Sequence, residues 1–167
     1  MRRLLLLRHA KSSWDDPSLA DHDRPLAARG HEAAQRMTEH LRSSAPPVDL
    51  VLCSSALRTT ETLQHVGSAF GDAETVVEDG LYGATADDLL DRLRRIPEEA
   101  AGVALIGHNP GVQDLAIELA EGGDDVERMR TKFPTGALAI LVFDGPWAGL
   151  RQGGGRLVGF VTPKDLA

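Results

Sequence analysis

Four residues of this chain have side chains suited to moving a phosphoryl group, and each closely follows a short apolar run of sequence. They are Arg8, His9, Arg58 and His108. A neutral imidazole can attack phosphorus and carry the phosphoryl group covalently, and arginine guanidinium groups form paired hydrogen bonds with its charged oxygens. These residues therefore fit phosphoryl transfer, on the condition that the fold brings them to one place.

The apolar runs have the length of buried strands and alternate with segments of helical spacing. The runs cover residues 4–7, 50–53, 75–77, 103–106, 137–142 and 157–161. Between them apolar residues recur every three or four positions, as in Ala33, Met37 and Leu41, which is the pattern of an amphipathic helix. This alternation predicts an α/β protein, a three-layer α/β/α sandwich with a mainly parallel sheet. At least one of the last two strands is expected to run antiparallel at an edge.

In such a sheet, ligands bind where the carboxyl ends of parallel strands meet. The first, second and fourth runs lead into the four residues named above, and the third leads into Glu78 and Asp79. The sequence therefore predicts a single site that collects two arginines, two histidines and a carboxylate.

Two helix starts can be recognised from their residue types. Thr85 and Asp88 have the spacing of a capping box, although glutamate is the commoner acid at its last position. Asn109 followed by Pro110 is typical of an N-cap and a first-turn proline. The second of these starts directly follows His108, so it would help to fix the position of that histidine.

Length and composition favour one ordinary domain, residues 1–167, in a reducing compartment. The chain has 42% hydrophobic and 26% charged residues, a net charge of −7 and the single cysteine Cys53. This charge opposes binding to nucleic acid, which requires a basic surface. No apolar stretch approaches the roughly 20 residues that span a bilayer. We therefore expect a cytoplasmic protein with no nucleic-acid or membrane partner, and nothing in the sequence requires an oligomer rather than a monomer.

Two other phosphatase chemistries are weaker interpretations. Cys53 and Arg58 are one residue too close for the phosphate loop of the cysteine-dependent phosphatases, and a cysteine at the end of an apolar strand is usually buried and inert. His31 and Glu32 lack the second histidine of a zinc-binding helix, and the remaining histidines share no ligand spacing. A metal site is therefore not expected.

Four blocks of sequence resemble the motifs of the histidine phosphatase superfamily, in the form found in its SixA-type members. In order along the chain they are LRHAKS at 7–12, DRPL at 23–26 with RG at 29–30, CSSALRTTET at 53–62 and GHNPG at 107–111. The chain departs from the family at Ala27, where a capping threonine is usual, and at Ser55, where a proline is usual. Neither departure removes a residue of the proposed chemistry.

This resemblance implies a phosphoglycerate mutase-like fold and a role for each matched residue. His9 would be the nucleophile that forms a phosphohistidine, and Arg8, Arg58 and His108 would hold the phosphoryl oxygens, with Ser12 as a further substrate-binding residue. Two arginines and a histidine would supply the positive charge, so no metal or other cofactor is expected.

The general acid and the substrate are the open parts of this prediction. The position that holds a proton-donating glutamate in larger members falls on Asp79, which is one methylene shorter and has Glu78 beside it. Short connections around the site would admit the phosphohistidine of a protein, which is the expected substrate. They would equally admit a small phosphomonoester, which is the alternative, whereas a phosphoprotein-binding module without activity is disfavoured because all four matched residues are present.

Overall fold

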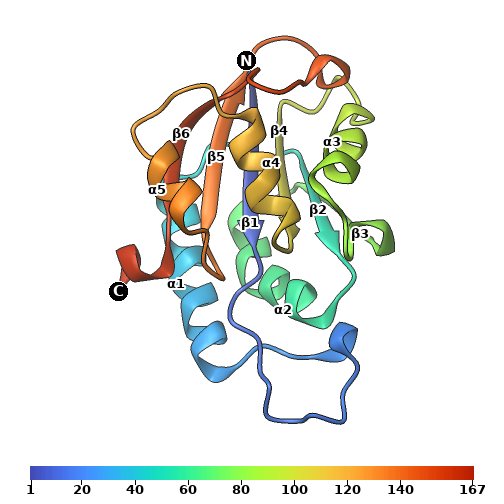
Figure 1. Cartoon of the computed structure of the whole chain (residues 1–167), viewed down its shortest axis with the longest axis vertical. Coiled ribbons are helices and arrows are strands. Elements are labelled where there is room, and N and C mark those ends of the chain that lie inside the picture. Colours follow the sequence, from blue (N-terminus) through green and yellow to red (C-terminus); the bar gives the residue numbers. More distant parts are fainter.

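The computed structural model describes all 167 residues, and its centre is one six-stranded sheet (Figure 1). The strands are β1 (Arg2–Arg8), β2 (Leu50–Ser54), β3 (Glu74–Glu78), β4 (Gly102–Gly107), β5 (Leu138–Phe143) and β6 (Arg156–Val161). They lie in the order β3-β2-β4-β1-β5-β6. The pairs among β1 to β4 are parallel, whereas β5 is antiparallel to both of its neighbours. The mainly parallel sheet is thus confirmed.

The expected antiparallel strand at an edge is confirmed, because the edge strand β6 pairs antiparallel with β5. β5 is an interior strand, because β6 pairs with its free side and becomes the edge. Both β5 and β6 are short apolar runs joined by a loop, and that pattern does not indicate which of the two lies outside.

Five α-helices cover the two faces of the sheet. They are α1 (Ala28–Ser44), α2 (Leu57–Val66), α3 (Ala86–Arg94), α4 (Gly111–Leu119) and α5 (Val126–Thr131). Buried residues of α1 and α2 pack on one face, and those of α3, α4 and α5 pack on the other, which gives the predicted three layers. Figure 1 shows α4 in front of the sheet and α1 behind it. No helix is long and apolar enough to cross a membrane.

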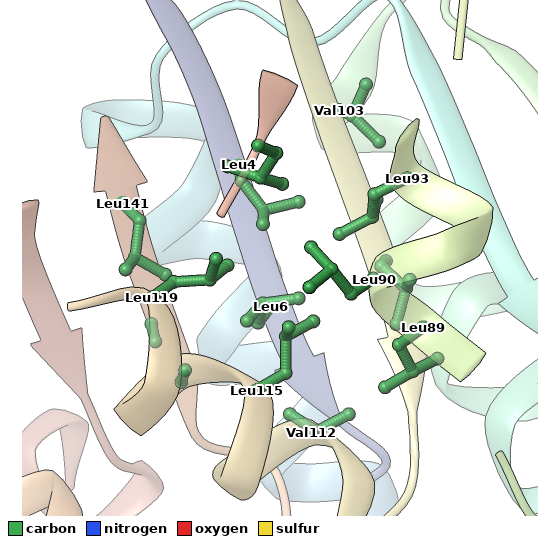
Figure 2. Packing of buried hydrophobic residues seen from close by; sticks show 14 of the residues in the cluster. Leu4, Leu6, Leu89, Leu90, Leu93, Val103, Val112, Leu115, Leu119 and Leu141 are labelled. Carbon is green, nitrogen blue, oxygen red and sulfur yellow. The ribbon is translucent and has the colours of Figure 1, made fainter. Parts of the chain in front are cut away.

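The central strand β1 supplies side chains to both cores. Leu4 and Leu6 belong to the larger cluster, and Leu5 and Leu7 belong to the smaller one on the opposite face. All four are at most 2% exposed, and full burial of a leucine side chain contributes about 1.5 to 3 kcal/mol. Figure 2 shows Leu6 packed among leucines of α3 and α4. β1 is therefore firmly held, and so is the loop that begins where it ends.

The two predicted helix starts differ in outcome. Thr85 forms the predicted capping box, in which its hydroxyl accepts from the backbone N–H of Asp88 and the Asp88 carboxylate accepts from that of Thr85. The helix after His108 begins one residue later than expected, at Gly111, so the prediction that Asn109 is its N-cap was wrong. The Asn109 side chain still serves this helix start, because its oxygen accepts from the backbone N–H of Gln113 at 3.2 Å.

Candidate active site

The carboxyl ends of β1, β2 and β4 meet around a pocket of about 280 Å³. It is lined by Arg8, His9, Lys11, Ser12, Trp14, Arg24, Arg58, His108, Asn109 and Thr135. The imidazole rings of His9 and His108 have centroids 5.3 Å apart, so both can reach one phosphoryl group. The structure brings the four predicted residues together, and Ser12 lies with them. Their catalytic roles stay predictions.

His9 is oriented by the loop that follows β1. Its Nδ1 lies 2.7 Å from the carbonyl oxygen of Ala10, and because a carbonyl oxygen only accepts, Nδ1 carries the proton. The neutral ring then has its lone pair on Nε2. Burial, and next the proximity of His108 and the charges of the two arginines, lower the pKa of His9 to about 3, against the opposing effect of the Ala10 carbonyl. His9 is thus a neutral imidazole near pH 7, which is the form that attacks phosphorus.

His108 lies at the end of β4 and is half-buried. Its Nε2 is 2.7 Å from the Ser54 hydroxyl oxygen, whereas its Nδ1 is buried without a hydrogen-bond partner in the protein. Burial and then the charge of Arg58 lower the pKa of His108 to about 4. The ring is therefore neutral as well, and one of its two nitrogens forms no hydrogen bond within the protein.

Arg8 and Arg58 bring positive charge to the pocket from two different elements. Arg8 donates to the carbonyl oxygen of Phe133 at 3.0 Å, and its Nε is buried without a partner. Arg58, in the first turn of α2, is only 8% exposed and donates to Asp21, to the backbone oxygen at 2.7 Å and to Oδ2 at 3.0 Å. Burial and the neighbouring Arg58 lower the pKa of Arg8, but an arginine so displaced still carries its charge.

Asp21 organises the rim of the pocket, although its role was not predicted from the sequence. Its carboxylate accepts hydrogen bonds from the Tyr82 hydroxyl at 2.6 Å, from Arg58 and from Arg24 at 3.1 Å. These bonds, that of Tyr82 first, hold the pKa of Asp21 well below its usual range. The only signal in the sequence is the i, i+3 spacing of Asp21 and Arg24, which a single 3₁₀ turn (Asp21–Asp23) converts into an ion pair.

Arg24 and Trp14 were also missed as pocket residues. The Arg24 guanidinium carbon lies 3.2 Å from the centroid of the Trp14 ring, in the stacked arrangement favoured by cation–π attraction. Arg24 also donates to the Ser12 hydroxyl oxygen at 2.5 Å and to the Ser13 carbonyl at 3.1 Å. The hydroxyl of Ser12, predicted to bind substrate, is therefore held by Arg24 at the pocket wall.

The residues around Arg58 in the third motif mainly support the other loops. The hydroxyl oxygen of Thr62 accepts from the backbone N–H of Ala10 at 3.0 Å, next to His9. A carboxylate oxygen of Glu61 accepts from the backbone N–H of Leu26 at 2.8 Å. α2 therefore holds the loop after β1 and the segment that carries Arg24. Hydrogen bonds thus connect the third sequence motif to the first and the second.

Neither predicted carboxylate lines the pocket. Glu78 forms a two-pronged ion pair with Arg92, at 2.8 and 2.9 Å, and this partner lowers its pKa. Asp79 is exposed at the start of a 3₁₀ turn and forms no side-chain hydrogen bond. No aspartate or glutamate is among the lining residues. The proposed role of Asp79 as a general acid stays a prediction, and its position does not support it.

The two weaker interpretations find no support in the site. Cys53 is fully buried, lies outside the pocket, and has a pKa raised to about 12 by burial, so its reactive thiolate form is disfavoured. No three histidine, cysteine or acidic side chains are gathered as a metal site would require. His31 and His65 form a pair, with ring nitrogens 2.9 Å apart, but no third ligand accompanies them.

The fold and the site together are typical of a protein that handles phosphoryl groups, and comparison with known proteins identifies the family. The model of the histidine phosphatase superfamily (branch 1) matches residues 4–99. The chain belongs to this superfamily. An uncharacterized protein of Mycobacterium tuberculosis is 41% identical over 162 residues, which cover 95% of this chain and all of that protein.

Solved structures and curated relatives then point to the SixA type within the superfamily. The structure of a SixA protein from Nakamurella multipartitia, assigned provisionally as a phosphohistidine phosphatase, has a TM-score of 0.86 and 33% identity, over 97% of this chain and 96% of that one. The phosphohistidine phosphatase SixA of Escherichia coli is 28% identical over 85% of this chain and 86% of its own length. The phosphoglycerate mutase-like fold is confirmed, and these similarities support phosphatase activity.

Proposed function

We propose that this protein removes the phosphoryl group from phosphohistidine in proteins, through a covalent phosphohistidine on His9. One observation carries the choice of substrate, namely that no carboxylate lines the catalytic pocket. An alkyl phosphate leaves as a strongly basic alkoxide, for which a positioned general acid contributes roughly 10² to 10⁴ in rate. A phosphohistidine ring that is protonated on its second nitrogen leaves as a neutral imidazole and needs no such acid.

The reaction would then proceed in two displacements at phosphorus. The Nε2 lone pair of His9 forms a bond to phosphorus while the bond to the substrate imidazole nitrogen breaks, and that ring departs neutral. Arg8, Arg58 and the free nitrogen of His108 hold the phosphoryl oxygens, whose charge is spread in the transition state. A water molecule next attacks phosphorus, and the bond to Nε2 breaks with its electron pair returning to His9. Orthophosphate leaves with both protons of that water, and the His9 ring is neutral again.

The covalent step is tested by trapping. Brief incubation with a ³²P-labelled phosphohistidine protein, followed by denaturation in base, should leave label on His9, because phosphoramidates survive base and hydrolyse in acid. His9→Ala should abolish both label and turnover. Arg58→Ala should lower kcat/KM on the order of 10²-fold or more. Wild-type turnover by His9→Ala would refute the mechanism.

The substrate class is tested by comparing kcat/KM for a phosphohistidine protein, a sugar phosphate and an aryl phosphate. We expect the phosphohistidine protein to rank first and the sugar phosphate last, because the sugar is the poorest leaving group without an acid. Asp79→Asn should leave phosphohistidine hydrolysis close to the wild-type rate. A sugar phosphate that ranks first would favour the small-molecule phosphomonoesterase instead.

The proposed reaction requires no metal or other cofactor. The proposal also places the protein in the cytoplasm. The two arginines supply the positive charge that a divalent ion supplies in many phosphoryl-transfer enzymes, and neutral His108 adds a hydrogen bond. Full activity after exhaustive treatment with a chelator is the expected result, and a loss that divalent metal restores would contradict it. A buried free thiol at Cys53 suits a reducing compartment.

A further inference from the structure

A second and larger groove, of about 830 Å³, lies beside the catalytic pocket between α1, α5 and the chain after β6. Six basic side chains line it, namely Lys11, Arg29, Arg36, Arg128, Lys132 and Lys164. The only acidic side chain in its lining is that of Glu32. We call this surface the basic groove. Its lining is positively charged, although the chain as a whole has a net charge of −7.

Most of these cations are not neutralised by the protein itself. Arg128 pairs with Asp165, but none of the other five has a carboxylate within 4.0 Å. All five are exposed. Like charges held on one concave surface repel one another and raise the local concentration of anions. The groove is therefore built to receive negative charge from outside the chain.

The basic groove is continuous with the catalytic pocket. Lys11 and Thr135 line both, and Lys11 stands only two residues after His9. A molecule whose phosphoryl group reaches His9 can therefore extend over Lys11 into the groove. This continuity ties any anion bound there to the substrate of the site.

The lining of the basic groove favours acidic side chains over a nucleotide or another ligand with an apolar ring. Of its 15 lining residues three are hydrophobic. Its aromatic residue, Phe160, is only 4% exposed, and the Arg128 guanidinium carbon lies 5.2 Å from its ring centroid. No aromatic face is thus free for a base to stack on, which is how proteins commonly hold unpaired bases. Exposed lysines and arginines suit carboxylates, which they attract without needing one fixed geometry.

We propose that the basic groove binds an acidic surface segment of the phosphohistidine protein next to its phosphorylated residue. This inference rests on the proposed function, since it names a feature of the same substrate. Charge complementarity of this kind mainly accelerates productive encounter and selects among partners. The groove would thus make an otherwise simple phosphatase site selective for phosphohistidines that have aspartate and glutamate nearby.

The test uses two phosphohistidine peptides of equal length, one with acidic and one with neutral flanking residues, at low ionic strength. For the wild-type protein kcat/KM should be roughly 10-fold or more higher for the acidic peptide. Arg36→Glu combined with Lys132→Glu should bring this ratio to about one without changing kcat/KM for the neutral peptide. The control is Arg151→Glu, which reverses one charge, half of the change in the groove variant, in the β5–β6 loop at the opposite end of the sheet.

The outcomes separate the two proposals. If neither peptide is hydrolysed, the proposed function fails. If both are hydrolysed equally well by the wild-type protein, or if Arg151→Glu abolishes the preference as completely as the groove variant does, the docking proposal is overturned. Inhibitors of acidic-peptide hydrolysis give a further test. If an oligonucleotide inhibits more strongly than polyglutamate of equal charge, and the groove variant loses this inhibition, the docking proposal is overturned in favour of a nucleic-acid site.

Discussion

At the scale of single residues, the protonation state of His9 is set by its surroundings in the fold rather than by the ordinary pKa of an imidazole. Its pKa is lowered to about 3, and that of His108 to about 4, mainly by burial. Both rings should therefore stay neutral from pH 8 down to pH 5. An NMR titration, with resonances assigned through His9→Asn and His108→Asn, should show no protonation of either ring in this range. A midpoint near 6.5 for His9 would contradict the effect of burial on this ring.

The same shift predicts how stability depends on pH. In the unfolded chain His9 binds a proton near its ordinary value of 6.5, and in the folded protein only near 3. The unfolded state therefore binds more protons between these values, so stability falls as pH drops below 6.5 and stops falling near 3. At pH 5 the loss from His9 is on the order of 2 kcal/mol. Denaturant unfolding at pH 7.5 and pH 5 should show it, and His9→Asn should reduce it.

Asp21 is the residue whose importance is visible only in the structure. It takes up two donor groups of Arg58 and the hydroxyl of Tyr82, and so acts as a positioning residue for the arginine. Asp21→Ala should lower kcat roughly 10-fold through misalignment, and Asp21→Asn, which keeps an acceptor oxygen, should lower it less. Asp23→Ala in the same 3₁₀ turn is the control, since the Asp23 carboxylate pairs with His22, at 3.6 Å, and with no arginine. Equal kcat values for Asp21→Ala and the wild type would refute this role.

At the scale of elements, the start of α1 holds the catalytic loop at very close range. A Cβ atom at Gly30 would lie 2.1 Å from the carbonyl oxygen of Lys11, far inside contact distance. Gly30→Ala should therefore push the loop after β1 out of its position and cost about 1 to 3 kcal/mol of stability. It should also lower kcat/KM, by a factor at least as large as the decrease in the folded fraction of the protein. Gly67→Ala is the matched control, because its nearest atom would be Leu63 Cδ1 at 3.7 Å. Similar melting temperatures for the two variants would contradict the argument.

What could be predicted from the sequence follows from how local each signal is. The six strands were found within about two residues because each is a buried apolar run, and burial is read directly from residue type. The capping box at Thr85 is equally local. The interior position of β5 depends on β6, and the network of Asp21 depends on Tyr82, 61 residues away in the chain. No spacing rule in the sequence relates residues or strands that are so far apart in the chain. The absence of a carboxylate from the catalytic pocket is likewise seen only in the folded chain.

At the scale of the whole molecule, we expect a monomer. The sheet ends in the edge strands β3 and β6, where Val77 and Val158 are each 50% exposed. Exposed Glu74 on β3 and exposed Arg156 on β6 make edge-to-edge pairing unfavourable. The net charge of −7 further separates copies, most strongly at low salt, where the Debye length is about 30 Å at 0.01 M. The edges should therefore prevent dimerisation even when salt screens this repulsion.

Sedimentation velocity at micromolar concentration should give a single species near 17.9 kDa, at both low and high ionic strength. A dimer only at high salt would mean that net charge, rather than the residues on the edges, keeps the copies apart. A dimer at both would contradict the prediction altogether, and Val77→Lys and Val158→Lys would then identify the edge responsible. Because the catalytic pocket is lined by residues outside both edge strands, neither substitution should change turnover of an aryl phosphate.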